Sequence, residues 1–530
     1  MIDRRDFLKM ATLVGTSVLT GFTPFNVIKN QNIRTFSLCT NSAVLNSHPE
    51  FADIIVQSGI TDVWMPVFLN GYWPYPVEDI LKWKAGIEKK GIAVHALTVP
   101  FGHPNNSLGG DTSFDVPPQH WPRSVDVDGK LYSGTSVHPV VTDENRVVIQ
   151  KAANQGFKKL FLDDDFRLAR SPGTIGGCFC DWHKQDFTTK YSYNEQDWLQ
   201  LKQDIKNREL SEVLRNWTNY NCDQLTTSFR AQQAAAPDLS LGIMVMYLGA
   251  EKAGIRLADY KNSLFRVGEL MFDDRSFNPV KGKTDELFSV LFHRRFVKSE
   301  LAFSETTAYP ADKLSAKNMA AKLHISTIAD VRNTMMMSGL EPFPFEHWDT
   351  LAPAMKKAAE IHQKIAGQKP TGPFKHFWGE SSRMIGNDKP FSLFLASGIP
   401  FEVCEEPASD GWTFLSDFDA ADVETGKLKS NGTTFLHGSN PEKKFSKVRF
   451  VAENLQEIFA FKHEIIPQLK GIPYVFEDKP VVCAWYPESK TVLLWNLSEN
   501  KEVFTVVKDD EKRSVQINGL DAELIYLWLK

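Results

Sequence analysis

The sequence lacks the features that mark several classes of protein. It has no P-loop, no internal repeat and no low-complexity segment, and beyond its first 22 residues no run is long and apolar enough to span a bilayer. Its 60 lysines and arginines are scattered among 65 acidic residues, so the net charge of -5 gives no reason to expect nucleic acid as a partner. These absences indicate a globular protein. Its 530 residues are enough for two or three domains.

Cysteine is scarce, with six in the whole chain. Cys39, Cys222, Cys404 and Cys483 are widely dispersed, and spacing alone assigns no disulfide to any of them. Aromatic residues are plentiful at 12%. That content suits ordinary core packing, and it also suits a carbohydrate binder whose sugars stack on ring faces.

The first residues carry a targeting pattern. Arg4 and Arg5 precede a large apolar pair, and a short, weakly apolar stretch continues to Phe22. This pattern resembles the twin-arginine export signal of bacteria. We therefore expect residues 1–30 to be a signal segment and the remainder to be periplasmic or secreted. The sequence leaves open whether the segment is cleaved or kept as an anchor.

From about residue 31, short apolar runs alternate with amphipathic helical segments. This alternation is typical of βαβ units with a parallel sheet. A (β/α)8 TIM barrel over residues 31–370 is the simplest closed arrangement, and a doubly wound sheet is the alternative. The eight candidate strands lie in RTFSLCTNS, TDVWMPVF, IAVHALTVP, KKLFLDDDF, LSLGIMVMY, FRVGELMF, ELAFSETTAY and TMMMSGLEPF.

Carboxylates end two of these strands. Asp163, Asp164 and Asp165 end or follow the fourth strand, and Glu305 ends the seventh. The carboxyl ends of barrel strands face the active site, so acids from strands four and seven would meet across the mouth. A glycosidase needs such a pair, one to protonate the leaving oxygen and one to attack or to activate water. The alternative is that these are solvated or salt-bridged loop acids.

Here the chain resembles the glycoside hydrolases of clan A, most of all the trimeric β-galactosidases of family 42. The family's Asp-Asn-Glu-Phe segment after strand four is matched by Asp163, Asp164, Asp165 and Phe166. The resemblance implies that Asp165 is the acid/base, that Asp164 binds the sugar in place of the family's Asn, and that Glu305 is the nucleophile. Asp is one methylene shorter than the family's Glu, so the match departs at the catalytic position itself.

The same resemblance implies a metal site. The family holds a structural zinc with cysteines just after strand four and one further upstream, where this chain has Cys178, Cys180, His183 and His138. Two thiolates and two imidazoles would fill a tetrahedral zinc site, which makes it structural, and the chemistry itself requires no cofactor. The alternative is a pair of loop cysteines with incidental histidines.

Other residues near strand ends are candidates of lower weight. Asp273 and Asp274 follow strand six, and with Asp165 they form the competing arrangement of α-galactosidase-like enzymes. Arg167 could hold the neighbouring aspartates in place. The remaining candidates for the sugar pocket, for each of which packing is the alternative role, are Trp64, Asn70, Trp73, His103, Glu341 and Trp348.

Two smaller domains are expected after the barrel. Residues 371–470 are predicted to form an α/β unit similar to the flavodoxin-like domain of family 42, which implies a homo-oligomer built through it. Residues 471–530 show short alternating strands typical of a small β-sandwich.

The predicted function is that of an exported retaining glycoside hydrolase acting on a β-linked oligo- or polysaccharide. The alternatives are an α-glycosidase that uses the aspartates of strands four and six, a non-catalytic glycan-binding protein, and a metal-dependent sugar isomerase.

Overall fold

The computed structural model describes residues 33–102, 116–163, 166–268, 270–338 and 341–527. The described residues belong to one compact unit, which begins at Ile33. The predicted twin-arginine segment lies outside the described residues. Among the helices that are described, none has both the length and the apolarity needed to cross a membrane.

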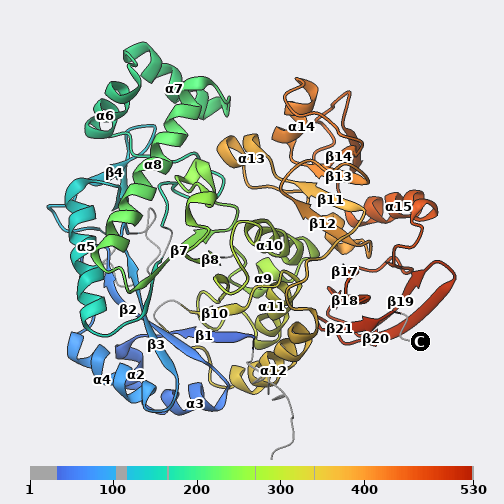
Figure 1. The fold of residues 1–530 in the computed structure, drawn as a ribbon, viewed down its shortest axis with the longest axis horizontal. Coiled ribbons are helices and arrows are strands. Elements are labelled where there is room, and N and C mark those ends of the chain that lie inside the picture. Colours follow the sequence, from blue (N-terminus) through green and yellow to red (C-terminus); the bar gives the residue numbers. More distant parts are fainter. Residues whose placement is uncertain (1–32, 103–115, 164–165, 269, 339–340, 528–530) are drawn as a thin grey trace, which may run out of the picture. The chain divides into compact units, whose positions relative to one another are not determined.

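The first part of the described chain is a closed barrel of eight parallel strands, in the order β1-β10-β9-β8-β7-β6-β3-β2 (Figure 1). Its strands are near-continuous apolar runs because both faces of a parallel sheet are buried. The eight-stranded barrel is therefore confirmed, and the doubly wound alternative is wrong for this part. The strands are β1 (Thr35–Cys39), β2 (Asp62–Leu69), β3 (Ala93–Val99), β6 (Lys159–Leu162), β7 (Ser240–Met246), β8 (Leu264–Gly268), β9 (Ala302–Thr307) and β10 (Asn333–Met337).

Helices surround the barrel, and their ends are set by local side chains. Asn194 and Asp197 form a capping box at the start of α7, and Ser211 accepts a hydrogen bond from the backbone N–H of Leu214 at the start of α8. A hairpin of β4 (Arg123–Val125) and β5 (Leu131–Thr135) interrupts the loop after β3. The helices of this part are α2 (Ser42–Ser47), α3 (Phe51–Gln57), α4 (Val77–Glu88), α5 (Pro139–Asn154), α6 (Asp181–Tyr191), α7 (Glu195–Asn207), α8 (Glu212–Ala235), α9 (Asp274–Phe277), α10 (Val280–His293), α11 (Ala316–Ile328) and α12 (His347–Ile365).

The barrel interior is packed with side chains. One cluster takes a residue from each of seven strands, and its aromatic members are Trp64, Phe161 and Phe303. The ring centroids of Trp64 and Phe161 are 4.6 Å apart. Trp64 is the third residue of β2 and is fully buried, so its predicted place after the strand, in a sugar pocket, is wrong. Its bulk fills the barrel instead.

A five-stranded parallel sheet follows, in the order β12-β11-β13-β14-β15 (Figure 1). In chain order this is 2-1-3-4-5, the order found in flavodoxin-like sheets. The predicted α/β unit is therefore present, whereas its role in oligomerisation stays a prediction. Its elements are β11 (Phe374–Phe377), α13 (Glu380–Ile385), β12 (Phe401–Cys404), β13 (Trp412–Leu415), α14 (Asp417–Glu424), β14 (Thr434–Gly438), β15 (Arg449–Ala452) and α15 (Leu455–Ile465).

The crevice at the carboxyl edge of this sheet is filled by the chain itself. Sheets of this order bind ligands where the strand order reverses, here between β11 and β13. At that point Asp419 accepts hydrogen bonds from Gly379 N at 3.0 Å, Ser382 Oγ at 2.5 Å and Ser416 Oγ at 3.1 Å. Burial raises the pKa of Asp419 to about 6. A buried carboxyl thus takes the place that an anionic ligand would need.

The C-terminal part consists of two antiparallel three-stranded sheets, β16-β19-β20 and β17-β18-β21. Apolar residues from both sheets, Val475 and Phe504 from one and Val481 and Leu494 from the other, share one core. This is the small sandwich expected from the alternating pattern. Its strands are β16 (Tyr474–Val475), β17 (Val481–Tyr486), β18 (Thr491–Asn496), β19 (Glu502–Lys508), β20 (Glu511–Ile517) and β21 (Ala522–Tyr526).

A fully buried histidine lies where α10 of the barrel meets the five-stranded sheet. The ring of His376 in β11 packs 4.3 Å from that of Phe288 in α10 and 5.7 Å from that of Phe394. Neither ring nitrogen has a hydrogen-bond partner within the described chain. Burial lowers the pKa of His376 to about 3, so the folded protein keeps the ring neutral.

The substitution His376→Phe should change how stability depends on pH. The unfolded chain takes up a proton near pH 6.5, whereas the folded chain resists protonation down to about pH 3, so stability falls as the pH drops through this window. Relative to the variant, the wild type should lose about 1.4 kcal/mol of unfolding free energy for each pH unit below 6.5. Urea denaturation of both proteins at several pH values measures this difference.

Phe394→Leu is the matched control, because it disturbs the same packing without removing a titratable group. It should lower the free energy of unfolding by a similar amount at every pH. Parallel pH profiles for the wild type and His376→Phe would show that burial of this ring does not couple stability to pH.

Candidate active site

The mouth of the barrel brings together charged side chains from three strands. Asp163 directly follows β6, Arg266 lies in β8 and Glu305 lies in β9. These are the fourth, sixth and seventh strands of the barrel. Asp163 therefore lies at the end of strand four as predicted, whereas Glu305 lies two residues before the end of strand seven.

Arg266 bridges the two carboxylates. Its Nε lies 2.8 Å from Oε2 of Glu305, and its Nη2 forms an ion pair with Oδ1 of Asp163. The side chain of Arg266 is 0% exposed, that of Glu305 4% and that of Asp163 3%. A buried guanidinium of this kind is stabilised only when opposite charges contact it, and here two do so.

The second oxygen of Glu305 is held as well. Thr307, two residues along β9, donates its hydroxyl to Oε1 of Glu305. Both oxygens therefore have a partner, which fixes the rotation of the carboxylate about its side chain. The Arg266 guanidinium also lies over the ring of Phe161 at 5.2 Å, so the ion bridge rests on the aromatic packing of the barrel interior.

Cys39 of β1 lies in the same electrostatic field. Burial, opposed by Arg266 and assisted by Glu305, raises the pKa of its thiol to about 12. The thiol is therefore protonated at neutral pH. Since the thiolate is the nucleophilic form, Cys39 has no role as a nucleophile here.

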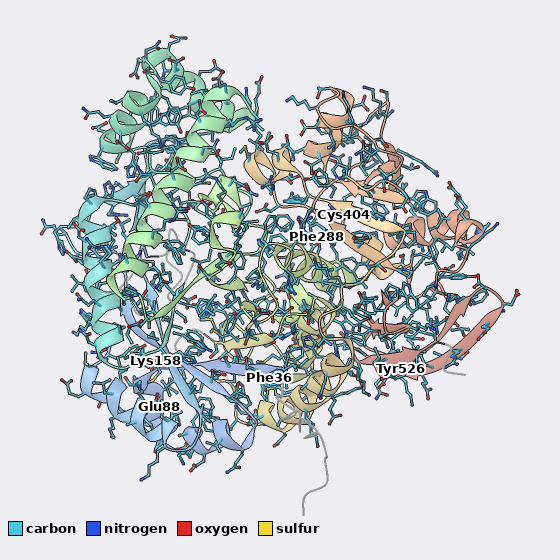
Figure 2. All side chains as sticks on the ribbon, viewed as in Figure 1. Phe36, Glu88, Lys158, Phe288, Cys404 and Tyr526 are labelled. Atoms are coloured by element: carbon cyan, nitrogen blue, oxygen red, sulfur yellow. The ribbon has the colours of Figure 1, made fainter. Side chains whose placement is uncertain are left out.

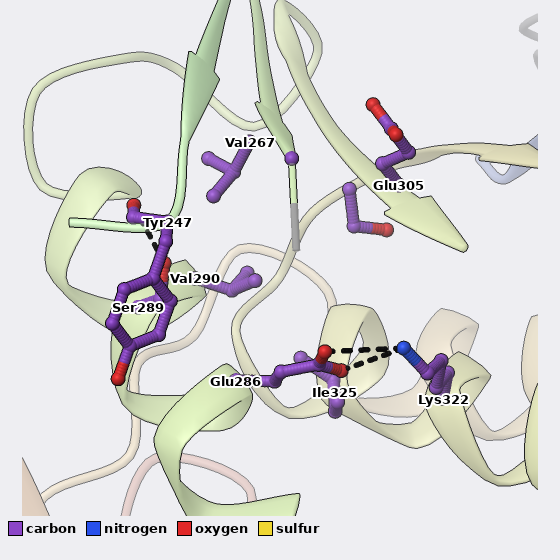
Figure 3. A pocket seen from close by; sticks show the side chains of 10 residues that line it. Tyr247, Val267, Glu286, Ser289, Val290, Glu305, Lys322 and Ile325 are labelled. Carbon is purple, nitrogen blue, oxygen red and sulfur yellow. Dashed lines mark hydrogen bonds and ion pairs between the residues drawn. The ribbon is translucent and has the colours of Figure 1, made fainter. Parts of the chain in front are cut away.

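A second buried ion pair, outside these strands, supports a loop at the mouth of the barrel. Lys322 of α11 lies 2.9 Å from Glu286 of α10, and the two side chains bond the backbone of Met271, in the loop after β8, at 2.7 and 2.8 Å. The adjoining cavity of about 10 Å³ is far too small for a sugar. Glu305 points away from this pair (Figure 3). The pair therefore supports the loop, and the carboxylate of Glu305 faces the barrel interior.

Three predicted site residues lie outside the described residues, namely His103, Asp164 and Asp165. The acid/base assignment to Asp165 and the sugar-binding assignments to Asp164 and His103 stay predictions. Asp163 is described, and its pairing with Arg266 gives it a charge-balancing position rather than an open one. Arg167 was expected to hold the aspartates, and its Nη1 lies 3.1 Å from the Met246 sulfur at the end of β7.

The aspartates of the competing arrangement are engaged in local structure. Asp273 caps α9 by accepting a hydrogen bond from the backbone N–H of Ser276 at 2.7 Å, and the Ser276 hydrogen bonds lower the pKa of its carboxyl. Asp274 accepts from the backbone N–H of Ser315 at 2.8 Å and from Asn318 at 2.7 Å. Both carboxylates hold loops and helix ends together, which leaves the α-glycosidase arrangement without geometric support.

The aromatic candidates pack against other side chains. Trp348 is buried in α12 against Phe51, so its predicted place in the sugar pocket is wrong. Trp73 is 37% exposed, but its ring lies 3.8 Å from the ammonium group of Lys151 on the outer helix α5. Both rings complete packing around the barrel.

Two candidates remain on loops. Asn70 follows β2 with a left-handed backbone at φ 47° and is buried, while its backbone N–H donates to Val99 O at 2.9 Å. Glu341 is exposed after β10. The geometry gives Asn70 a turn-forming position and leaves Glu341 accessible.

Arg266 was not anticipated from the sequence. The signal was present, because an arginine inside the apolar strand LFRVG must be buried and paired. The identity of its partners, however, depends on which strands close the barrel.

A second cluster could hold a metal ion. The ligand atoms of His138, Cys178, Cys180 and His183 all lie within 4.8 Å of one another. The His183 Nδ1 lies 3.2 Å from the Cys180 sulfur, and Nε2 of His138 is buried without a hydrogen-bond partner in the described chain. Burial lowers the pKa of His138 to about 4, and the hydrogen bond between the two cysteine side chains lowers the pKa of Cys180 and raises that of Cys178. Neutral imidazole and thiolate are the forms that bind metals.

The cluster joins two loops of the mouth. His138 is the last residue before α5 and belongs to the loop after β3. Cys178 and Cys180 belong to the loop after β6, and His183 lies in the first turn of α6. A metal held by these four residues would fasten the loop that contains Asp163 to its neighbour.

The comparisons with known proteins concern the fold. No protein-family model and no curated protein matches the sequence. Among solved structures, the chain is similar to the β-galactosidase from Rahnella sp. R3, with a TM-score of 0.57 and 11% identity over 93% of this chain and 98% of that one. It is also similar to the β-galactosidase from the psychrophilic Marinomonas ef1, with a TM-score of 0.55 and 9% identity over 92% and 99%. The barrel and both appended domains thus follow an architecture seen in these enzymes.

The substitution Arg266→Met should destabilise the fold, because it leaves Asp163 and Glu305 as buried carboxylates with no cation. The expected loss is about 3–5 kcal/mol of unfolding free energy, measured by chemical denaturation. Adding Asp163→Asn and Glu305→Gln to the Arg266→Met variant should restore much of the lost unfolding free energy, because no buried charge then lacks a counter-charge.

Arg146→Met is the matched control. Arg146 pairs with Asp143 at 3.2 Å and is half exposed, so its loss should cost less than about 1 kcal/mol. If Arg266→Met were as stable as the wild type, the ion bridge would not be what holds the mouth together.

Proposed function

We propose that this chain is a glycoside hydrolase that cleaves a β-linked sugar from an oligo- or polysaccharide with retention of configuration. The observation that carries the proposal is Glu305, a carboxylate near the end of the seventh barrel strand with both oxygens held. The architecture shared with two β-galactosidases supports the reaction class. In this proposal Glu305 is the nucleophile and Asp165 the acid/base.

The proposed chemistry needs an ionised nucleophile. Arg266 Nε lies 2.8 Å from Oε2 of Glu305, and the Glu305 carboxylate would attack the anomeric carbon. Asp165, in the loop after β6, would protonate the leaving oxygen and then deprotonate the water that releases the sugar. A retaining mechanism needs the two carboxyl groups about 5–5.5 Å apart.

A glycan-binding protein on the same barrel is the second candidate. The observation that favours it is the ion bridge itself, because Arg266 neutralises charge on both Asp163 and Glu305. Such a protein would bind a glycan without turning it over.

A panel of aryl α- and β-glycosides tests the proposal, with galactose, glucose, fucose, arabinose and uronic acids as the sugars. The wild type should cleave a β-glycoside, and Glu305→Ala should lower kcat by at least about 1,000-fold, or about 4 kcal/mol of transition-state stabilisation. Azide should rescue that variant and give a glycosyl azide of inverted configuration. Asp165→Asn should lose most activity on substrates with poor leaving groups, because only these leaving groups need to be protonated as they depart.

Glu300→Ala is the matched control, since Glu300 is exposed just before β9, at the opposite end of the strand. It should keep wild-type activity. Full activity in Glu305→Ala together with its loss in Asp273→Asn or Asp274→Asn would replace the assignment by the α-glycosidase arrangement. Glycan binding without turnover by the wild type would favour the second candidate.

We further propose that the His138, Cys178, Cys180 and His183 cluster holds a structural zinc ion. Two sulfur and two nitrogen ligands leave no open position, so the ion would support the loops rather than enter the chemistry. The purified protein should contain about one zinc per chain by elemental analysis, and Cys180→Ser should lose it and melt at a lower temperature.

Cys404→Ser is the control for that experiment, because Cys404 is a half-buried free cysteine outside the cluster. It should keep the metal. Equal metal content in Cys180→Ser and the wild type would exclude these residues as the ligands.

A further inference from the structure

The loop after β6 folds back on itself, and its tip contacts the unit that holds the five-stranded sheet. Its two arms meet where Gly177 N donates to Leu168 O at 2.9 Å, and at the tip Thr174 N lies 3.1 Å from Ser171 O. Both arms also donate backbone hydrogen bonds, at 2.7 and 2.8 Å, to the short helix after β7. Asp163, one of the carboxylates of the mouth, directly precedes this loop. The position of the loop therefore bears on the mouth.

Asp388 binds the tip of this loop. It lies between α13 and β12, and its side chain is 3% exposed. One carboxylate oxygen, Oδ2, accepts a hydrogen bond from Gly173 N at 2.6 Å. The other, Oδ1, lies 2.6 Å from Nζ of Lys252, whose side chain is 1% exposed. One buried carboxylate thus joins the loop after β6, the loop after β7 and the sheet unit.

The carbonyl group of Gly173 is held as well. Arg208, which follows α7, donates to Gly173 O. The same guanidinium donates to Ile385 O at 2.6 Å and to Gly386 O at 2.9 Å. Gly173 has a φ of 74°, and a Cβ atom added there would lie 2.6 Å from Asn387 O. The tip therefore fits this segment with no room for one further carbon atom.

Other contacts join the sheet unit to the barrel without reaching this loop. His376 packs on Phe288, which is labelled in Figure 2. Arg215 of α8 forms an exposed ion pair with Glu380 of α13. The two units are therefore joined at several places, and what Asp388 adds is a fixed position for the tip of the loop after β6.

We propose that Asp388 is a positioning residue for the proposed glycosidase: by holding Gly173 it sets the place of the loop after β6, which carries the proposed acid/base. The inference rests on the proposed function and adds that the sheet unit completes the active-site framework. A general acid must lie within hydrogen-bond reach of the leaving oxygen. A misplacement of about 1 Å can lower the rate about 100-fold, so the support of this loop affects the chemistry.

Gly173→Ala tests the proposal and keeps the ion pair of Asp388 with Lys252. The added methyl group collides with Asn387 O and should displace the tip. The measurement is kcat/KM on aryl β-glycosides with leaving groups of graded basicity. It should fall at least about tenfold for the poorest leaving group and less than about twofold for the best, because only poor leaving groups need the acid. A purely structural role would lower the melting temperature and leave this dependence unchanged.

Gly426→Ala is the matched control. Gly426 follows α14 with a φ of 76°, and a Cβ atom there meets nothing within 4 Å. The variant therefore has the same backbone strain without the collision. It should keep the wild-type dependence on the leaving group.

A double variant tests Asp388 directly. Asp388→Ala combined with Lys252→Met removes both members of the ion pair, so neither charge stays buried without its partner. It should show the same selective loss on poor leaving groups as Gly173→Ala. Arg215→Met combined with Glu380→Gln breaks an exposed pair between the same two units and should behave as the wild type does.

The two proposals fail in different ways. A wild type that cleaves no glycoside would overturn the proposed function and this role with it. Cleavage by the wild type, together with an unchanged leaving-group dependence in Gly173→Ala and in the Asp388 double variant, would overturn the positioning role alone.

Discussion

A single buried guanidinium organises the mouth of this barrel. Arg266 is fully enclosed, so its charge requires compensation, and it receives compensation from Asp163 on one side and Glu305 on the other. The bridge rests on the aromatic packing that fills the barrel below it. The same interaction that stabilises the fold also fixes the position of the Glu305 carboxylate.

Polar contacts help to hold the loops that surround this bridge. Glu286 and Lys322 hold the loop after β8 through Met271. The cluster around Cys178 and Cys180 brings the loops after β3 and β6 together.

Much of the architecture could be predicted from local pattern. Eight apolar runs separated by helical segments gave the barrel, because strands buried on both faces must be continuously apolar. Counting those strands also placed Glu305 correctly at the mouth. The same counting misplaced Trp64 and Trp348, because a tryptophan near a strand or helix end serves packing or stacking equally well. The direction in which each ring points decides between those roles. The rings of Trp64 and Trp348 both point into packed apolar side chains.

The sequence by itself determined the eight strands of the barrel, the two smaller units that follow it and the types of residue near the strand ends. Each of these depends on periodicity and spacing along the chain. Only the tertiary structure decided that Arg266 pairs with Asp163 and Glu305, and that Asp273 and Asp274 hold local structure together. The physical reason is that the partners of a buried charge are chosen by barrel closure and domain packing, which bring together side chains far apart in the sequence.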